Sequence, residues 1–560
     1  MIHNSKNSQN LLIIIAIVIS VNLLGNYFFH RFDLTQDKRY TLSQTSIDIV
    51  KKVNDPLYID VYLDGEFPGE FKKLQNETKQ LLEEFKASNS NLIFQFINPH
   101  ENENANLGKS KQLVGKGLIP INITVDDKGK QTQNMVFPWA IARYKGKEIK
   151  IQLLKNMIGA SVADKVVSSV QHLEYAFANA INTISQKKEK KIAVLKGNDE
   201  LPDLLMADFI KEVKNNYFIG TFNLDSVAKK PIETLKDLKN YDLVIITKPQ
   251  EKFSEAEVQV LDQYIINGGK TLWLLDFVHA EMDDLNQNGS TSAVANDLGL
   301  NELFFKYGIR IYPGLVKDEQ SIPIKLATGE PGSKTEYQQY LWKFSPFIYP
   351  ETNHPIVKNM EGIKFEFTNP IELLKNTLTK TVLLQSSKYS KMVAVPAQIN
   401  LSMVEEKTSG SEYLNKGFMP VSVLIEGKFT SMLQNRVLPF DDTSFLNKSK
   451  NSNKMIIVSD GDLIRNQIDK DGIPLELGFD KWTNNQYGNK EFAMNCVNYL
   501  LDENGLINIR SKEVDIPTLD KEKVFQEYSK NQFIAVGLPL IILGVFGFIF
   551  NFLRKRKYAR

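Results

Sequence analysis

Two long apolar runs lie at the ends of this 560-residue chain, Leu11 to Phe29 and Phe533 to Leu553. At about 1.5 Å of helix rise per residue, each can cross a hydrocarbon core of roughly 30 Å. The basic segment 554–560 follows the second run, and such charges stay in the cytoplasm. Two crossings return residues 1–10 to the same side. We therefore expect two transmembrane helices, at 11–29 and 533–553, with the bulk of the chain outside the cytoplasm.

A cleavable signal peptide is the alternative reading of the first run. Signal peptides have a shorter apolar region followed by a small-residue cleavage site. Here the run continues through residues 22–29, and no cysteine follows it that could carry a lipid anchor. We expect the first run to remain as a membrane helix.

The region between the runs has the composition of a folded protein. Its charges nearly balance, with 68 Lys and Arg against 66 Asp and Glu over the whole chain. This balance provides no field that would attract nucleic acid, so nucleic acid is excluded as a partner. The single cysteine, Cys496, lies in a helix-like apolar stretch and is expected to be buried.

Residues 31–186 are expected to form a first domain of α/β class. Ser43 is a candidate N-cap for the helix that opens this domain. A strand, a helix and a second strand then form a β-α-β unit with parallel strands. The expected elements are a helix at 44–53, strands at 57–63, 92–97 and 119–125, a helix at 71–85, two strands within 135–154, and a helix at 161–185. This order resembles a thioredoxin-like domain, with Pro120 before a strand, but no C-x-x-C is present.

Residues 191–512 are expected to form a second α/β domain. Strands and helices alternate, and the strands at 192–195, 243–246 and 271–275 are continuously apolar. Such strands indicate a parallel sheet with helices on both faces, a Rossmann-like or glutamine-amidotransferase-like sandwich. An irregular insertion at about 280–433 interrupts the pattern. Residues 513–532 are expected to link this domain to the second membrane helix.

Asp460 and Asp462 are the candidate ligand residues. They follow the apolar strand 455–458, and the carboxyl ends of strands bind ligands in open α/β sheets. Two acids flanking Gly461 could hold a divalent cation, although a simple turn explains Asp-Gly equally well. Both interpretations stay open.

The other chemistry-bearing residues do not form a motif. Gly108-Lys109-Ser110 resembles the end of a phosphate-binding loop, but the earlier glycine is missing. His172 and Glu174 are two apart on a helix and point away from each other. We expect no catalytic residue, no cofactor and no metal, and therefore no enzyme.

Five segments carry a resemblance to a known family. They are 31–35 and 40–43 (RFDLT and YTLS), 62–68 (YLDGEFP), 173–175 (LEY) and 459–462 (SDGD). Together with the terminal apolar run, their order resembles auxiliary proteins of ABC-type transport systems, in particular the gliding-motility-associated GldG family. The resemblance implies a periplasmic body in a gliding bacterium of the Bacteroidetes type. It also implies two partners, an ABC permease and, through it, a cytoplasmic ATPase.

The family has been described as substrate-binding components, so two functions are considered. The first is a noncatalytic scaffold or conformational coupling partner of the permease, which attachment by two spans favours. The alternative is a solute-binding component with its ligand near Asp460 and Asp462.

The membrane runs contain candidate interface residues. Asn22 and Asn26 are one helical turn apart, and amides in lipid seek partners on a neighbouring helix. Gly537 and Gly544 permit close approach of another helix. Alternatively, the asparagines lie near the membrane surface and the glycines have no special role.

Overall fold

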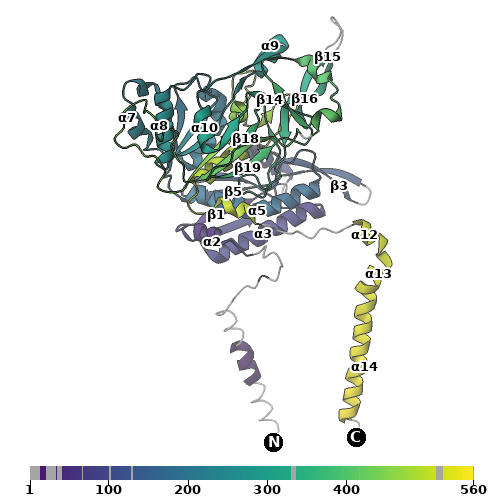
Figure 1. The fold of residues 1–560 in the computed structure, drawn as a ribbon. Helices are drawn as coiled ribbons and strands as arrows, with labels where there is room; N and C mark the ends of the chain where they lie inside the picture. The colour runs from purple at the N-terminus through teal and green to yellow at the C-terminus, as the bar shows by residue number, and fades with distance from the viewer. Residues whose placement is uncertain are drawn as a thin grey trace. The chain divides into compact units, whose positions relative to one another are not determined.

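The computed structural model describes residues 13–20, 33, 41–65, 67–99, 103–127, 130–328, 336–414, 416–512 and 521–558. The chain divides into two units, Met1–Lys512 and Glu513–Arg560 (Figure 1). The fold is a mixed α/β structure with several sheets. Each unit is described by itself.

The N-terminal part of the first unit contains a four-stranded sheet with the order β2-β1-β5-β6. Strand β1 pairs in parallel with β2, as expected of a β-α-β unit, and antiparallel with β5. Strands β3 and β4 form a hairpin of their own outside this sheet. The elements are α2 (Gln44–Lys51), β1 (Leu57–Val61), α3 (Gly69–Ser88), β2 (Leu92–Phe96), α4 (Glu103–Gly115), β3 (Ile121–Asp127), β4 (Lys130–Val136), β5 (Trp139–Tyr144) and β6 (Lys147–Gln152).

Helix α5 (Val162–Ser185) packs against α3 and the four-stranded sheet. The helix lies where it was predicted, and its apolar stripe is buried from Val166 to Ile184, whereas Val162 in the first turn is exposed. The predicted N-cap of α2 is also confirmed, because the Ser43 hydroxyl accepts the N–H of Ser46. A polar residue before a short apolar stripe therefore fixes where each of these helices begins.

A seven-stranded sheet forms the centre of the second half, in the order β19-β22-β23-β10-β9-β7-β8. The five strands from β23 to β8 are parallel, as predicted, but β22 runs antiparallel to both of its neighbours, β23 and β19. Parallel strands need a crossover, and the connection 428–452 between β22 and β23 contains no helix. The strands are β7 (Lys191–Lys196), β8 (Phe218–Asn223), β9 (Leu243–Thr247), β10 (Lys270–Leu274), β19 (Thr379–Gln385), β22 (Pro420–Gly427) and β23 (Asn453–Val458).

Helices cover both faces of this sheet, which explains its continuously apolar strands. Leu272 and Leu274 of β10 face one core with α6 and α11, whereas Trp273 faces the other core with α7, α8 and α10. In the second core the Trp273 ring meets Phe304 edge-on, with centroids 5.2 Å apart. Figure 1 shows α7 and α8 beside each other. These helices are α6 (Ala207–Asn216), α7 (Pro231–Leu238), α8 (Glu255–Ile266), α10 (Asn301–Tyr307) and α11 (Asn489–Leu501).

The stretch 280–433, expected to be irregular, is rich in strands. Small antiparallel sheets surround a further core that includes Leu315, Trp342 and Phe344. Strands β19 and β22 from this stretch also extend the seven-stranded sheet. The other elements are β11 (Val278–His279), α9 (Met282–Asn288), β12 (Ser290–Ala295), β13 (Ile309–Ile311), β14 (Gly314–Asp318), β15 (Ser321–Thr328), β16 (Glu336–Ile348), β17 (Ile363–Lys364), β18 (Ile371–Leu373), β20 (Ser390–Ala394) and β21 (Ala397–Asn400).

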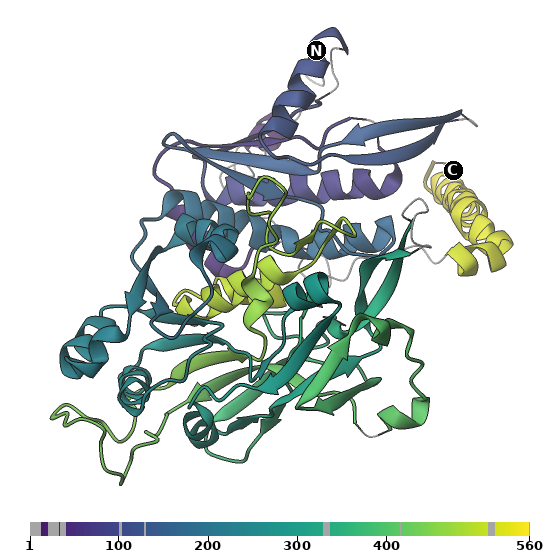
Figure 2. The ribbon, with the colours of Figure 1, turned by 90° about the horizontal axis from the view of Figure 1, so that it is seen from above.

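A buried ionic network joins the two halves of the first unit, the part with the four-stranded sheet and the part with the seven-stranded sheet. Figure 2 shows α5 and α11 between these two halves. Glu491 of α11 lies 3.0 Å from the ammonium of Lys155 and 2.8 Å from the guanidinium of Arg510. Burial raises the pKa of Glu491, but these two cations outweigh it and hold the pKa at about 2. The carboxylate therefore stays charged and keeps the two halves in fixed contact.

The second unit is helical from residue 521 to residue 558. Its stretch Tyr528–Tyr558 is the one helix in the described part of the chain that is long and apolar enough to cross a membrane. It comprises α13 (Tyr528–Gln532), a π-helical turn (Phe533–Gly537) and α14 (Leu538–Tyr558), preceded by α12 (Lys521–Gln526). Most of the expected N-terminal span, 11–29, lies outside the described residues. Its described part, 13–20, is helical and exposed.

Candidate functional site

The carboxyl ends of β9, β10 and β23 meet at one edge of the seven-stranded sheet, and a group of charged side chains fills this edge. The ammonium of Lys248, directly after β9, lies 2.5 Å from Asp462, 2.8 Å from Glu281 and 3.6 Å from Asp276. The Lys248 side chain is only 6% exposed. We call these four residues, with Arg465, the strand-end cluster.

Arg465 is the second cation of the strand-end cluster. Its guanidinium lies 3.4 Å from Asp462 and 3.5 Å from Glu281, and 2.6 Å from Asp283 at the surface. Asp462 therefore contacts two cations. Both of its oxygens have partners within the protein.

Asp460 is fully buried and accepts backbone hydrogen bonds. Its Oδ1 accepts from the N–H of Asp462 at 2.8 Å, and its Oδ2 accepts from the N–H of Glu366 at 2.7 Å. The N–H of Gly461 donates to Asp276 at 2.6 Å. A Cβ at Gly461 would lie 2.5 Å from Cγ of Lys248, so only glycine fits here. The bond from Asp462 caps the short 3₁₀ helix Gly461–Ile464, whereas the bonds to Glu366 and Asp276 join distant segments to the end of β23.

The described residues contain no group of three His, Cys, Asp or Glu side chains arranged to hold a metal ion. The acids of the strand-end cluster instead surround Lys248 and Arg465. The sequence analysis did not identify these two cations as part of the site. The signal for one of them was available, since Lys248 follows the most apolar strand just as Asp460 follows β23.

Burial and the two cations shift the pKa values of the carboxyls at this edge in opposite directions. It raises the pKa of Asp276 to about 7, with Lys248 only partly offsetting the effect. It also raises the pKa of Asp460 well above its usual range. For Asp462, the charges of Lys248 and Arg465 outweigh burial and lower the pKa. The site thus holds a charged Asp462 beside acids that bind protons readily.

We predict that Asp276→Asn weakens the pH dependence of stability. A carboxyl whose pKa is raised in the folded state stabilises the fold at pH below about 4, and this contribution is lost as the pH rises through about 7. The free energy of unfolding of the native chain, measured by urea titration, should fall between pH 5 and pH 8, and that of Asp276→Asn should fall by about 1–4 kcal/mol less. The exposed Asp237→Asn is the control. Equal slopes for all three proteins would contradict the prediction.

A second buried carboxylate, Glu174 on α5, holds the two ends of the first unit together. Its Oε1 accepts from the Ser43 N–H at 2.7 Å and from the Ser46 hydroxyl at 2.8 Å. Its Oε2 accepts from the ammonium of Lys512 at 2.8 Å, which also donates to the carbonyl of Thr41 at 2.7 Å. We call Ser43, Ser46, Glu174 and Lys512 the end clamp. It brings residues near 41 and near 512 to one place.

In the sequence, Glu174 stood out in two ways, as a residue that points away from His172 and as part of the segment 173–175. The two side chains do go to different partners, since His172 lies 3.4 Å from a guanidinium nitrogen of Arg510. Burial raises the pKa of Glu174, but Lys512 and the hydrogen bonds from Ser43 outweigh it and lower the pKa. Glu174 is therefore charged at neutral pH.

We predict that Glu174→Ala destabilises the first unit by about 3 kcal/mol, because it leaves the Ser43 N–H and the Lys512 ammonium without their partner. Trypsin should then cut after Lys512 faster than in the native chain. Thermal unfolding of the full chain followed by tryptophan fluorescence, with timed proteolysis, measures both effects. Glu233→Ala, which breaks an exposed ion pair with Lys230, is the control. A melting temperature equal to that of the control would contradict the role of the clamp.

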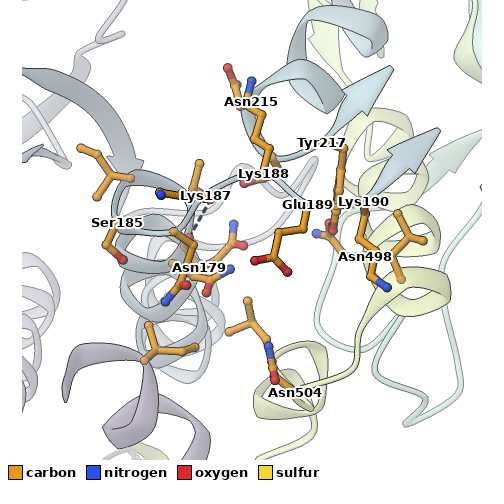
Figure 3. A pocket seen from close by; sticks show the side chains of 18 of the residues that line it. Asn179, Ser185, Lys187, Lys188, Glu189, Lys190, Asn215, Tyr217, Asn498 and Asn504 are labelled. Atoms are coloured by element: carbon orange, nitrogen blue, oxygen red, sulfur yellow. Dashed lines mark hydrogen bonds between the residues drawn. The ribbon is translucent and has the colours of Figure 1, made fainter. Parts of the chain in front are cut away.

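A polar cavity of about 890 Å³ lies where the C-terminal ends of α5, α6 and α11 meet the linker 186–190. Figure 3 shows Asn179, Glu189, Tyr217 and Asn498 around it. The Tyr217 hydroxyl donates to Asn498 at 2.9 Å. Amide groups and apolar side chains both line the cavity, and its charged residues are Lys52, Lys145, Lys147, Lys187, Lys188, Lys190, Glu189, Asp502 and Glu503. The sequence did not predict this cavity, because its walls come from five separate segments.

The predicted membrane residues fall into two groups. Asn22 and Asn26 lie outside the described residues. Gly537 ends the π-helical turn and Gly544 lies within α14. A Cβ at Gly544 would meet no atom within 4 Å, so no described part of this chain covers the helix surface at Gly544. Gly108-Lys109-Ser110 lies inside α4, not before a helix.

Comparisons with known proteins give two family matches. A profile described as an ABC-type uncharacterized transport system (ABC_transp_aux) matches residues 189–496, more than half of the chain. A profile described as a domain of unknown function (DUF7088) matches residues 36–143. No curated protein matches the chain.

Two solved structures are similar over 56% of this chain. One is the N-terminal domain of mmIFT52, at 13% identity, 97% coverage of that chain and a TM-score of 0.32. The other is a ThuA-like protein from Parabacteroides merdae ATCC 43184, at 10% identity, 91% coverage and a TM-score of 0.26.

Proposed function

Since the chain belongs to the ABC-type uncharacterized transport system family, we propose that it is a noncatalytic auxiliary subunit of an ABC transporter complex. Its partners are a permease and, through the permease, a cytoplasmic ATPase. In this role the first unit acts as a scaffold that transmits or receives conformational change.

The end clamp is the observation that carries this proposal. Residues 41–46 follow the N-terminal apolar run, and Lys512 precedes the segment that leads to α14. One buried carboxylate binds both. A body attached to the membrane at both ends needs its two exits close together, and Glu174 holds them there. Movement of the two membrane helices would then act on the body at a single point.

Further parts of the proposal rest on the sequence. The basic tail after α14 supports a cytoplasmic C-terminus. With a first span at 11–29, both termini are cytoplasmic and the body is periplasmic in the inner membrane. The segments shared with the GldG family support a role in gliding motility in a bacterium of the Bacteroidetes type. The β-α-β unit with two added antiparallel strands supports a thioredoxin-like first domain, without redox cysteines.

The strand-end cluster supports a noncatalytic role. In open α/β sheets the carboxyl edge is where substrates and cofactors bind. Here Lys248, Asp276 and Asp462 occupy that edge with bonds to one another and are almost fully buried. The strand-end cluster stabilises the fold, and partners bind to other surfaces of the protein.

We predict that Asn22→Leu with Asn26→Leu lowers recovery of the permease when the tagged full chain is purified from its native host in mild detergent. Two amides in lipid would lose their partners on a neighbouring helix. Mass spectrometry of the native complex should find permease and ATPase in fixed proportion. Recovery of the native chain alone would refute the auxiliary function. Unchanged recovery with the double variant would refute only the helix interface.

Solute binding is the second candidate, and the polar cavity favours it. A volume of about 890 Å³ lies within the range of ligand sites, roughly 300–1,000 Å³. Asn179 and Asn182 offer amides that could bind a polar ligand. The sequence placed the ligand near Asp460 and Asp462, and this location is kept as a competing site.

A thermal-shift screen of the full chain against metals, sugars, peptides and nucleotides tests this candidate. A ligand at 100 times its Kd stabilises the native state by about 2.7 kcal/mol. If the cavity binds, Asn179→Leu with Asn182→Leu should abolish the shift, whereas Asp462→Asn should keep it. The opposite pattern would place the ligand at the strand ends. If none of the compounds shifts the melting temperature, binding of metals, sugars, peptides and nucleotides is refuted.

A further inference from the structure

Strand β8 ends the seven-stranded sheet, and no described strand pairs with its outer side. Most of its residues are exposed, and Phe218 keeps 55% of its surface in solvent. The strand reads Phe-Ile-Gly-Thr-Phe-Asn and contains no charged residue and no proline. Such an edge is a template for another strand.

The direction of the backbone groups follows from the bonds to β7. The N–H of Phe218 donates to Lys190 at 3.0 Å, and that of Leu224 donates to Lys196 at 2.9 Å. Backbone groups alternate sides along a strand. Ile219, Thr221 and Asn223 therefore direct their N–H and C=O groups outward.

The opposite edge of the same sheet is protected. Strand β19 carries Lys380 and has irregular register around Val382 and Leu384. Charges and bulges are the usual means by which proteins prevent edge pairing. Strand β8 has regular register with β7 and none of these features. The difference indicates that the β8 edge is covered in the working protein.

We propose that β8 pairs antiparallel with β8 of a second copy of this chain, so that two seven-stranded sheets become continuous across a two-fold axis. The two-fold axis passes between the two copies of Thr221, the middle one of the three outward residues. Ile219 then faces Asn223, and the three outward residues of each strand form about six hydrogen bonds.

The side chains fit the same register. Phe222 faces Gly220 of the second copy, and an aromatic ring over a cross-strand glycine stabilises such pairs. The two threonines on the axis form a favourable cross-strand pair. Phe222 is held in place by Tyr241, with ring centroids 5.8 Å apart. The register therefore follows from both backbone and side chains.

A cysteine at the axis tests the register. Paired residues of this type have Cα atoms about 5.5 Å apart, within the range for a disulfide. Thr221→Cys in the full chain, oxidised in native membranes, should give a disulfide-linked dimer on a non-reducing gel. The native Cys496 is buried and should not interfere. The control is the exposed, off-axis Ser226→Cys. Equal cross-linking of both variants, or none, would overturn the proposal.

A proline tests the pairing itself. The outward N–H of Thr221 has no bond to β7, so Thr221→Pro costs the single chain no ladder bond but blocks the edge. The Kd of the dimer in mild detergent should rise at least about tenfold, measured by light scattering. Thr221→Val keeps the N–H and should dimerise normally. If Thr221→Pro loses the permease but leaves self-association unchanged, another chain covers the edge and the second-copy proposal is wrong.

Discussion

The buried carboxylate of Glu174 is the contact on which the arrangement of the first unit depends. It binds the start of α2 through Ser43 and Ser46, lies within α5, and reaches Lys512 at the end of the second domain. Removing one partner of a buried charge is strongly destabilising, so the fold depends on all of these contacts being made. Because both ends of the body meet at one side chain, a change at either end reaches the other directly.

The same rule applies at the carboxyl edge of the seven-stranded sheet. Lys248 is almost fully buried and is bound by three acids, while Gly461 leaves it no spare room. Desolvation makes such a cluster expensive, and its mutual contacts offset the cost. An edge that elsewhere holds ligands is here closed by the chain itself. This agrees with the proposed noncatalytic role within the ABC-type transport system family.

Local sequence signals predicted the local structure well. The N-cap at Ser43, the helix at 161–185 and the apolar parallel strands are all confirmed. These features depend on near neighbours along the chain. Most strands within 280–433 were missed, since short antiparallel strands take their stability from distant partners. The same reason hid the end clamp, in which Glu174 and Lys512 are far apart in sequence.

The side of the membrane on which the body lies is the central claim, and one labelling experiment tests it directly. Cys496 is buried, so a single exposed cysteine at Glu233→Cys would report without background. A membrane-impermeant maleimide added to intact spheroplasts should label this variant fully before lysis. Labelling only after the membrane is opened would place the body in the cytoplasm and contradict the account.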